Sequence, residues 1–365
     1  MNISERRKSK PALPHIIYKV MRLFNKILFK LKYHFNHKFF YEQWIIGIAK
    51  GDMESMIRSK EFDPEIVWLP IKNFEENWAD PFIVKADDGS YDVYYEKFYD
   101  HPGVGSIWRM KINKDLEVIS HNEVLDRNFH LSYPYILREN GKFYIIPETA
   151  EIGKLSCYEY NHAENKIIKT NHLIDQALHD ATILKHNGKY WVFGMQRSKD
   201  DRSMYESWVY HAESFDGQYI PHSQNPVKVS LKGTRPAGDF IRINGDIYRP
   251  VQDCEKEYGK SIIINKLKKI CESSIEEEYH MTIEVKQKKQ NKRIRKIHTI
   301  NVVDDVIIVD GHRKVFSLSK LFVVFKRWWR ARTASLYLFL LQGNIDFMEW
   351  VYSDYMLEKE ILLIV

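Results

Sequence analysis

From about residue 64 to residue 313 the chain consists of short apolar and aromatic runs separated by polar turns. The turns are rich in Gly, Asp-Gly and Asn-Gly, and the three- and four-residue spacing typical of a helix is almost absent. Short β-favouring runs bounded by turn residues predict strands rather than helices. This part of the chain is therefore expected to be all-β.

One layout of strand, two-residue turn and strand recurs along this region. It occupies residues 79–96, 132–148, 180–194 and 238–250, with a weaker copy at 298–310. Asn-Gly and Asp-Gly turns tolerate positive φ and close β-hairpins. The copies recur about every 45 to 60 residues, the length of a four-stranded propeller blade. The repeat predicts a five-bladed β-propeller, because the competing β-sandwich fold would not require the same hairpin at regular intervals.

The two ends of the chain have a different, helical pattern. Residues 15–34 carry apolar side chains at three- and four-residue steps, with Lys19, Arg22, Lys26 and Lys30 on the other side. Helical spacing resumes after residue 313, where tryptophan alternates with arginine. We expect three parts: a basic amphipathic helical segment at 1–50, the propeller at 51–315, and a basic, aromatic helical segment at 316–365.

The basic ends change the expected location of the protein. No acidic residue lies between Glu5 and Glu42, although the net charge of the whole chain is only +6. A basic amphipathic helix can lie in the headgroup layer of an anionic membrane. The alternative is a helix packed on the domain's own surface. Nucleic acid is not an expected partner, because no known reader motif accompanies the charge.

Composition narrows the class of protein further. With 44% hydrophobic and 28% charged residues the chain is globular, and its three cysteines form no CxxC pair. We therefore expect no disulfide framework, metal or cofactor. Neither a signal-peptide core nor an uncharged apolar run of about 20 residues occurs, so the expected location is cytoplasmic, at the inner face of the cell membrane.

Polar side chains are predicted to converge where the inner strands of a propeller meet the axis. Aligning the hairpins by their turns places Asp80, Tyr133, Asp180 and Ala237 at one level of the first strand. Carboxylates accept hydrogen bonds from sugar hydroxyls, and aromatic faces stack on sugar C–H surfaces. The predicted sugar-binding set is Trp78, Glu96, Tyr133, Arg235, Asp239, Arg249, Gln252, Asp253, Tyr258, His298 and Asp310.

Three carboxylates are candidates for glycosyl chemistry, which needs one base and one acid. Asp80 is the expected base, and Glu148 or Asp180 the acid or orienting carboxylate. Arg235 and Arg249 have the planar fork that grips a phosphate in two places. Each of these side chains has an alternative structural role, as a turn cap or as one partner of a salt bridge between blades.

Several short motifs together resemble one family. They are Trp-Ala-Asp-Pro-Phe at 78–82, Ser-Tyr-Pro-Tyr at 132–135, Asp-Ala-Thr-Ile at 180–183, Arg-Pro-Ala-Gly at 235–238 and Tyr-Arg-Pro-Val-Gln-Asp-Cys at 248–254. The sequence is similar to the propeller-like domain at the N-terminus of glucosamine inositolphosphorylceramide transferases, which is also found in bacterial surface-polysaccharide proteins. The resemblance runs from about residue 43 to Arg313.

This resemblance implies glycan assembly, and a fold similar to the five-bladed glycoside hydrolases of the arabinanase and fructosidase type. Two departures limit what carries over. The larger enzymes' transferase domain, with its metal-binding Asp-x-Asp, is not in this sequence. The hydrolases place carboxylates on successive blades, whereas here Tyr133 stands opposite Asp80.

The expected function is a membrane-associated glycosyltransferase, or a component of one, in surface polysaccharide or glycolipid biosynthesis. Its partners would be a sugar nucleotide or lipid-linked glycan, the anionic membrane and a second glycosyltransferase. The alternatives are a non-catalytic, glycan-binding scaffold and a glycoside hydrolase. A hydrolase would be expected to meet its polymer outside the cell, so the lack of a signal peptide weighs against it.

The basic ends lead to a testable prediction. The protein should bind liposomes that contain anionic lipid. Binding should weaken as salt rises from 50 to 500 mM, because the screening length falls from about 14 Å to about 4 Å. Sedimentation with vesicles measures this. Equal binding to neutral and anionic vesicles would contradict it.

Overall fold

The structure is a computed structural model that describes residues 38–100, 103–286, 293–318, 320–323, 326 and 329. The chain forms two compact units, one of Glu42–Val315 and the other of Met1–Tyr41 with Phe316–Val365. All the sites discussed below lie in the Glu42–Val315 unit. Among the residues that the structure describes, no helix has both the length and the apolar character needed to cross a membrane.

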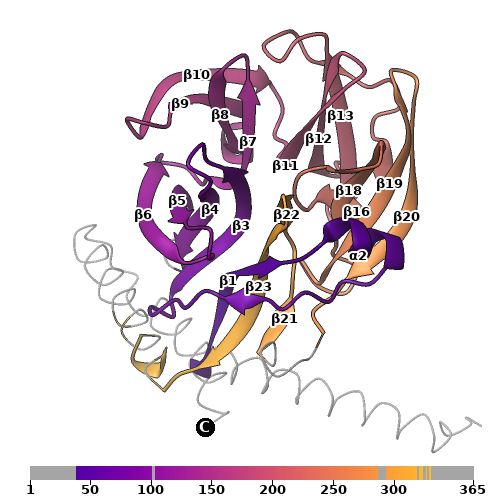
Figure 1. Ribbon diagram of the computed structural model, residues 1–365. Coiled ribbons are helices and arrows are strands. Elements are labelled where there is room, and N and C mark those ends of the chain that lie inside the picture. Colours follow the sequence, from indigo (N-terminus) through magenta and orange to yellow (C-terminus); the bar gives the residue numbers. More distant parts are fainter. Residues whose placement is uncertain are drawn as a thin grey trace, which may run out of the picture. The chain divides into compact units, whose positions relative to one another are not determined.

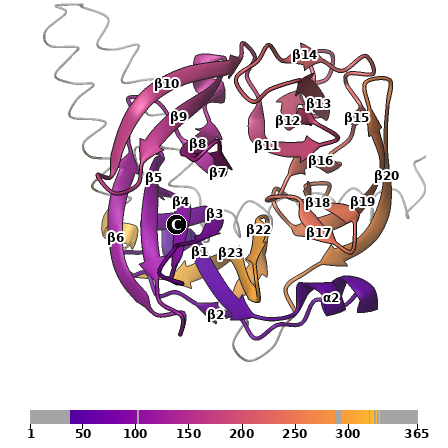
Figure 2. The ribbon, with the colours of Figure 1, turned by 45° about the horizontal axis from the view of Figure 1, so that its top comes forward.

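The Glu42–Val315 unit is a ring of five antiparallel sheets (Figures 1 and 2). In blades 1 to 3 the strands follow one another outward from the axis in chain order. Blade 1 contains β3 (Glu76–Lys85), β4 (Tyr91–Tyr99), β5 (Ser106–Ile112) and β6 (Val118–Leu125). Blade 2 contains β7 (Ser132–Glu139), β8 (Lys142–Glu148), the short helix η1 (Ala150–Ile152), β9 (Leu155–Asn161) and β10 (Lys166–Ile174).

Blades 3 and 4 each contain additional short strands. Blade 3 contains β11 (His179–His186), β12 (Lys189–Arg197) and β13 (Tyr205–Ala212), with β14 (Ile220–Pro221) and β15 (Lys228–Val229) both paired with β13. Blade 4 contains β16 (Lys232–Pro236) and β17 (Ile241–Ile243), both paired with β18 (Asp246–Asp253), and then β19 (Ser261–Cys271) and β20 (Ser274–Ile283). The predicted five-bladed propeller is confirmed.

Blade 5 is built from both ends of the propeller sequence. From the C-terminal side it takes β21 (Ile294–Lys296), β22 (Ile300–Val303) and β23 (Val306–Phe316). From the N-terminal side it takes β1 (Phe40–Lys50), which lies beside β23, and β2 (Val67–Trp68). The helix α2 (Met53–Ser59) joins β1 to β2 (Figure 2). This arrangement closes the ring by pairing segments more than 250 residues apart.

The predicted boundary at residue 50 is therefore wrong. Residues 40–50 are a strand rather than part of a helical segment, and Ile45, Ile46 and Ile48 on it are buried. The amphipathic spacing that predicted a helix ends near residue 34, so it gave no support for extending that segment to 50. The predicted helix at 15–34 lies outside the described residues, as does most of the segment 316–365.

The hairpin turns have the backbone geometry that their residues predict. Both residues of Asn140-Gly141, Asn187-Gly188 and Asn244-Gly245 have positive φ. This geometry is that of type I′ turns, whose twist matches that of the flanking strands. The fifth hairpin turns at Asp304, also with positive φ.

Gly238 is different from these turn glycines because it lies in the interior, at φ +130°. A Cβ placed on it would lie 1.9 Å from the carbonyl oxygen of Ile300, whereas a Cβ on Gly141 would meet nothing within 4 Å. Blades 4 and 5 can therefore approach each other closely only if residue 238 is glycine.

We predict that Gly238→Ala destabilises the propeller far more than Gly141→Ala. Both substitutions strain a positive φ, at about 1–2 kcal/mol. Only Gly238→Ala adds a backbone clash, which raises its total cost above about 3 kcal/mol. Urea unfolding of the two variants measures the difference. Equal losses would show that the blade contact at Gly238 relaxes freely.

Candidate functional site

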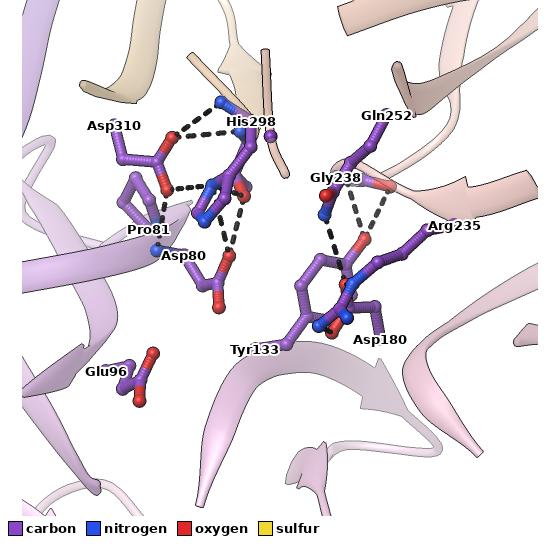
Figure 3. Close-up of polar contacts among 12 residues, drawn as sticks. Asp80, Pro81, Glu96, Tyr133, Asp180, Arg235, Gly238, Gln252, His298 and Asp310 are labelled. Carbon is purple, nitrogen blue, oxygen red and sulfur yellow. Dashed lines mark hydrogen bonds and ion pairs between the residues drawn. The ribbon is translucent and has the colours of Figure 1, made fainter. Parts of the chain in front are cut away.

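Three inner strands begin with the same backbone irregularity. Asp80, Tyr133 and Asp180 have φ of 50°, 45° and 52°, and the pairing register of β3, β7 and β11 shifts at each of them. In blade 4 the positive φ falls on Gly238 rather than on the predicted Ala237. A bulge of this kind re-aims a side chain, and these residues meet in the interior near the axis (Figure 3).

Asp80 belongs to a hydrogen-bonded group that joins blades 1 and 5. One Asp310 oxygen accepts from the backbone N–H groups of His298 and Thr299 at 3.0 and 2.9 Å. The other accepts from the Asp80 N–H at 3.0 Å and lies 2.6 Å from His298 Nδ1. The Thr299 hydroxyl donates to the Asp80 carboxylate at 2.7 Å. Every one of these residues is buried.

A second group joins blades 2, 3 and 4. Arg235 donates to both oxygens of Asp180 and lies 3.7 Å from Glu148. Gln252 donates to Asp180 at 3.1 Å, and His179 Nδ1 lies 2.9 Å from Glu148. We call Asp80, Glu96, Glu148, Asp180, Arg235, His298 and Asp310 the axial cluster.

Glu96, on β4, is the carboxyl group of the cluster with the fewest partners. It is 6% exposed, and His130 Nε2 lies 3.3 Å away. Figure 3 shows its carboxyl group apart from the other side chains drawn, with no bond to any of them. Burial raises the pKa of Glu96 well above its ordinary value, and the charges of Asp80, Glu148 and Asp180 raise it further. These surroundings therefore favour the protonated form of Glu96.

The pKa of Glu148 is shifted in the opposite direction to that of Glu96. Burial favours its neutral form, but the hydrogen bond from His179 and the charge of Arg235 lower its pKa to about 2. Two carboxyl groups whose pKa values are driven apart are suited to different roles. The electrostatics therefore favours Glu96 over Glu148 as a proton donor, and leaves Glu148 as an ionised orienting group.

Neighbouring charges also shift the pKa values of the other charged groups in the axial cluster. Burial and the Asp310 carboxylate raise the pKa of Asp80, although His298 opposes this shift. Burial disfavours the charged form of His298, yet Asp310 and Asp80 raise its pKa above the ordinary value. Burial opposes the charge of Arg235, but Asp180 and Glu148 raise its pKa well above the usual range. The cations thus balance part of the buried negative charge.

The aromatic side chain at this site is Trp44 rather than the predicted Trp78. Trp44 stacks on His298 with ring centroids 3.8 Å apart, and Tyr258 meets both rings edge-on. Arg235 lies 5.1 Å from the centroid of Tyr258, so Tyr258 lies beside the axial cluster. Trp78 instead packs on Tyr95 at 5.5 Å, in the core between blades.

Tyr133 is also misplaced as a sugar-binding residue. It is fully buried, and its hydroxyl bonds Thr182 at 2.9 Å and accepts from the Gly238 N–H at 2.7 Å. It therefore joins blades 2, 3 and 4 in the interior.

Three further predicted residues lie outside the axial cluster. Arg249 pairs with Glu277, and Asp253 lies 3.7 Å from Lys232. Asp239, whose pKa burial raises to about 6, lines a separate cavity of about 390 Å³ with Arg242. Arg249 and Asp253 lie at odd separations from Gln252 on β18, so they point to the opposite face of the strand.

Asp80, His298 and Asp310 are the described residues whose spacing suits a metal ion, with ligand atoms within 4.8 Å of one another. However, His298 Nδ1 and Asp310 Oδ2 are 2.6 Å apart. Two ligand atoms about 2 Å from one ion lie roughly 3 Å apart, so these two atoms fit a direct ion pair better than a shared ion.

Comparison with known proteins identifies the family. The family described as "Glucosamine inositolphosphorylceramide transferase 1, N-terminal" matches residues 72–309, more than half of the chain. The chain belongs to this family. That a related domain occurs in bacterial surface-polysaccharide proteins stays a prediction.

Curated relatives of this glucosamine inositolphosphorylceramide transferase N-terminal family come from plants. Glucosamine inositolphosphorylceramide transferase 1 of Arabidopsis thaliana is 29% identical over 303 residues, covering 74% of this chain and 39% of the relative. The Oryza sativa subsp. japonica protein of the same name is 28% identical over 156 residues, covering 42% of this chain and 21% of the relative. The chain thus spans about two fifths or less of the relatives it matches.

Among solved structures, the chain is similar to a family 117 glycoside hydrolase of Zobellia galactanivorans. The TM-score is 0.47 at 14% identity, covering 78% of this chain and 93% of that chain. It is also similar to a Cellvibrio cellulosa α-L-arabinanase complexed with arabinohexaose. The TM-score is 0.42 at 12% identity, covering 63% of this chain and 82% of that chain. The propeller assignment rests on the strand order above.

The pKa of Glu148 gives a prediction with a defined sign. Because its folded-state pKa of about 2 lies below the ordinary 4.5, the ionised group stabilises the fold fully above about pH 4.5. That contribution, on the order of 3 kcal/mol, is lost as pH falls toward 2. The stability difference between wild type and Glu148→Gln should shrink over that interval in denaturant unfolding, while exposed Glu61→Gln stays near wild type. A difference independent of pH would contradict the assignment.

Proposed function

We propose that this chain takes part in glycan assembly as a glycosyltransferase or a transferase component, and that it binds its sugar substrate at the axial cluster. The single observation that carries the proposal is that Asp80 and Glu96, both on blade 1, are buried carboxyl groups whose raised pKa values are influenced by the charge of Arg235. The relatives' name, a transferase acting on inositolphosphorylceramide, supports the same class of reaction.

The proposed roles follow from the contacts. Glu96 donates a proton to the leaving group, because burial and the neighbouring carboxylates raise its pKa and so favour its protonated form. Asp80 accepts a proton from the attacking hydroxyl, and its raised pKa brings it closer to neutral pH, where a general base is most effective. Glu148 and Asp180 hold Arg235 in place through the contacts described above.

Arg235 is suited to the phosphate of a sugar nucleotide or a lipid-linked sugar. Its Nε and Nη2 atoms are occupied by Asp180, whereas Nη1 has no hydrogen-bond partner among the described residues. One edge of the guanidinium is thus left for a ligand, and the ring of Tyr258 covers its face. Trp44, stacked on His298, offers an aromatic surface for a sugar ring.

The proposal includes a peripheral position on the inner face of the cell membrane, reached through the basic ends of the sequence. The support is the charge of the N-terminal segment. It contains lysine and arginine but no acidic residue between Glu5 and Glu42. A lipid-linked acceptor would be presented at such a surface. A partner glycosyltransferase belongs to the same proposal, and its support is the transferase name of the relatives.

A glycan-binding scaffold without catalysis is the second candidate. It is favoured by the engagement of Asp180 and Glu148 in ion pairs, which is typical of carboxylates that stabilise a fold. In that case the axial cluster would bind a glycan, and a partner would supply the chemistry. Glycoside hydrolysis stays a third possibility that the same assay detects, as release of free sugar without an acceptor.

The test is turnover of sugar nucleotides by purified protein with lipid-linked acceptors. Asp80→Asn should reduce turnover by about 10²- to 10⁴-fold, the usual contribution of an acid–base group. Asp87→Asn makes the same change at a fully exposed side chain and should leave turnover unchanged. Circular dichroism and unfolding establish that both variants fold.

Three results would decide between the candidates. Loss of turnover confined to Asp80→Asn supports the catalytic proposal. Glycan binding by wild type with no turnover for any donor supports the scaffold. Turnover that survives Asp80→Asn unchanged would overturn the assignment of the axial cluster.

A further inference from the structure

A groove of about 570 Å³ lies at the junction of blades 3 and 4, away from the axial cluster. Its charged and polar lining includes Lys228 on β15, Arg249 on β18, Asn265 on β19 and Glu277 on β20. Figure 2 shows these four strands on one side of the ring. No member of the axial cluster lines the groove, so this site is independent of the proposed function.

Arg249 is held rigidly but its hydrogen bonds are incomplete. Its Nε and Nη2 atoms donate to the two oxygens of Glu277, and its guanidinium lies 5.2 Å from the ring centroid of Phe193. The side chain is 3% exposed. The third nitrogen, Nη1, is buried and has no partner among the described residues. An unsatisfied buried donor costs about 1–3 kcal/mol, which an oxygen from a ligand would recover.

Lys228 adds a second positive charge to the same groove. It makes no hydrogen bond or ion pair with the part of the chain that the structure describes. A Cβ built on Gly233 would lie 2.7 Å from Lys228 Nζ and 3.9 Å from Asn265 Nδ2, so both side chains lie close to Gly233. Partial desolvation of its ammonium group and the charge of Arg249 lower the pKa of Lys228, although the residue as a whole is exposed.

The carboxylates of the groove do not balance these two cations. Glu277 stays ionised, because Arg249 outweighs the burial that would raise its pKa. Glu276, the other carboxylate of the lining, lies 3.8 Å from Lys269 and accepts from Ser274 at 3.1 Å. The lining holds two cations and two carboxylates, and Lys269 beside Glu276 adds a third cation, so one positive charge has no counter-charge here.

We infer that this groove binds an oxyanion, the carboxylate or phosphate group of a ligand, between Arg249 Nη1 and Lys228 Nζ. Arginine presents planar donors that suit either group, and lysine adds a point charge. Phe193 and Tyr279, also in the lining, give the groove apolar walls beside the charge. The matching ligands are an acidic sugar residue or a sugar phosphate.

Isothermal titration of the full chain with inorganic phosphate and, separately, with glucuronate tests the inference. We expect Lys228→Ala to weaken binding at least about tenfold, equivalent to about 1.4 kcal/mol, and Lys228→Arg to retain it. Lys232→Ala is the matched control, because Lys232 carries the same charge nearby but does not line the groove. Lys228 is exposed, so its substitution leaves the fold intact.

A double variant, Arg249→Met with Glu277→Met, removes the buried pair together and tests the arginine without leaving one charge unpaired. It should also abolish binding while folding normally. Binding of phosphate alone identifies a phosphate ligand, and binding of glucuronate alone identifies an acidic sugar. No binding of either, or equal binding by wild type and Lys228→Ala, would overturn the inference.

Discussion

Asp310 is the residue on which the arrangement at the axis depends. Its two oxygens receive backbone N–H groups from blade 5 and blade 1, and the His298 ring as well. Blade 5 is assembled from both ends of the propeller, so this carboxylate fixes the closure of the ring at its centre. The same bonds hold Asp80 in its positive-φ conformation. The closure and the candidate site thus share one set of interactions.

Burying several carboxyl groups around one axis is costly unless they are neutralised or protonated. The protein does both. Arg235 and His298 neutralise the carboxylates nearest to them, whereas the surroundings of Glu96, which has few partners, raise its pKa and favour its neutral form. The result is a cluster in which carboxyl groups of raised and lowered pKa lie together with cations. Glycosyl chemistry uses two carboxyl groups in different protonation states.

Much of the fold, and the positions of several candidate site residues, were predictable from the sequence. The Asn-Gly turns at 140–141, 187–188 and 244–245 established the repeat, and the repeat predicted that Asp80, Glu96, Glu148 and Asp180 lie around one axis. Figure 3 shows Asp80, Glu96 and Asp180 in one region, and Glu148 lies 3.7 Å from Arg235. The sequence could not reveal Trp44, because its strand pairs with β23 only after the ring closes. Arg249 was misplaced because hairpin alignment gives the level of a residue along a strand, but not which charged partner it meets.

The central claim is that a sugar substrate binds at the axial cluster with its phosphate on Arg235. A crystal structure of the protein with a bound sugar nucleotide tests it most directly. The account predicts the sugar within hydrogen-bond distance of Asp80 and Glu96, with a phosphate oxygen on Arg235 Nη1. A ligand bound elsewhere on the propeller, with these three side chains uncontacted, would contradict it.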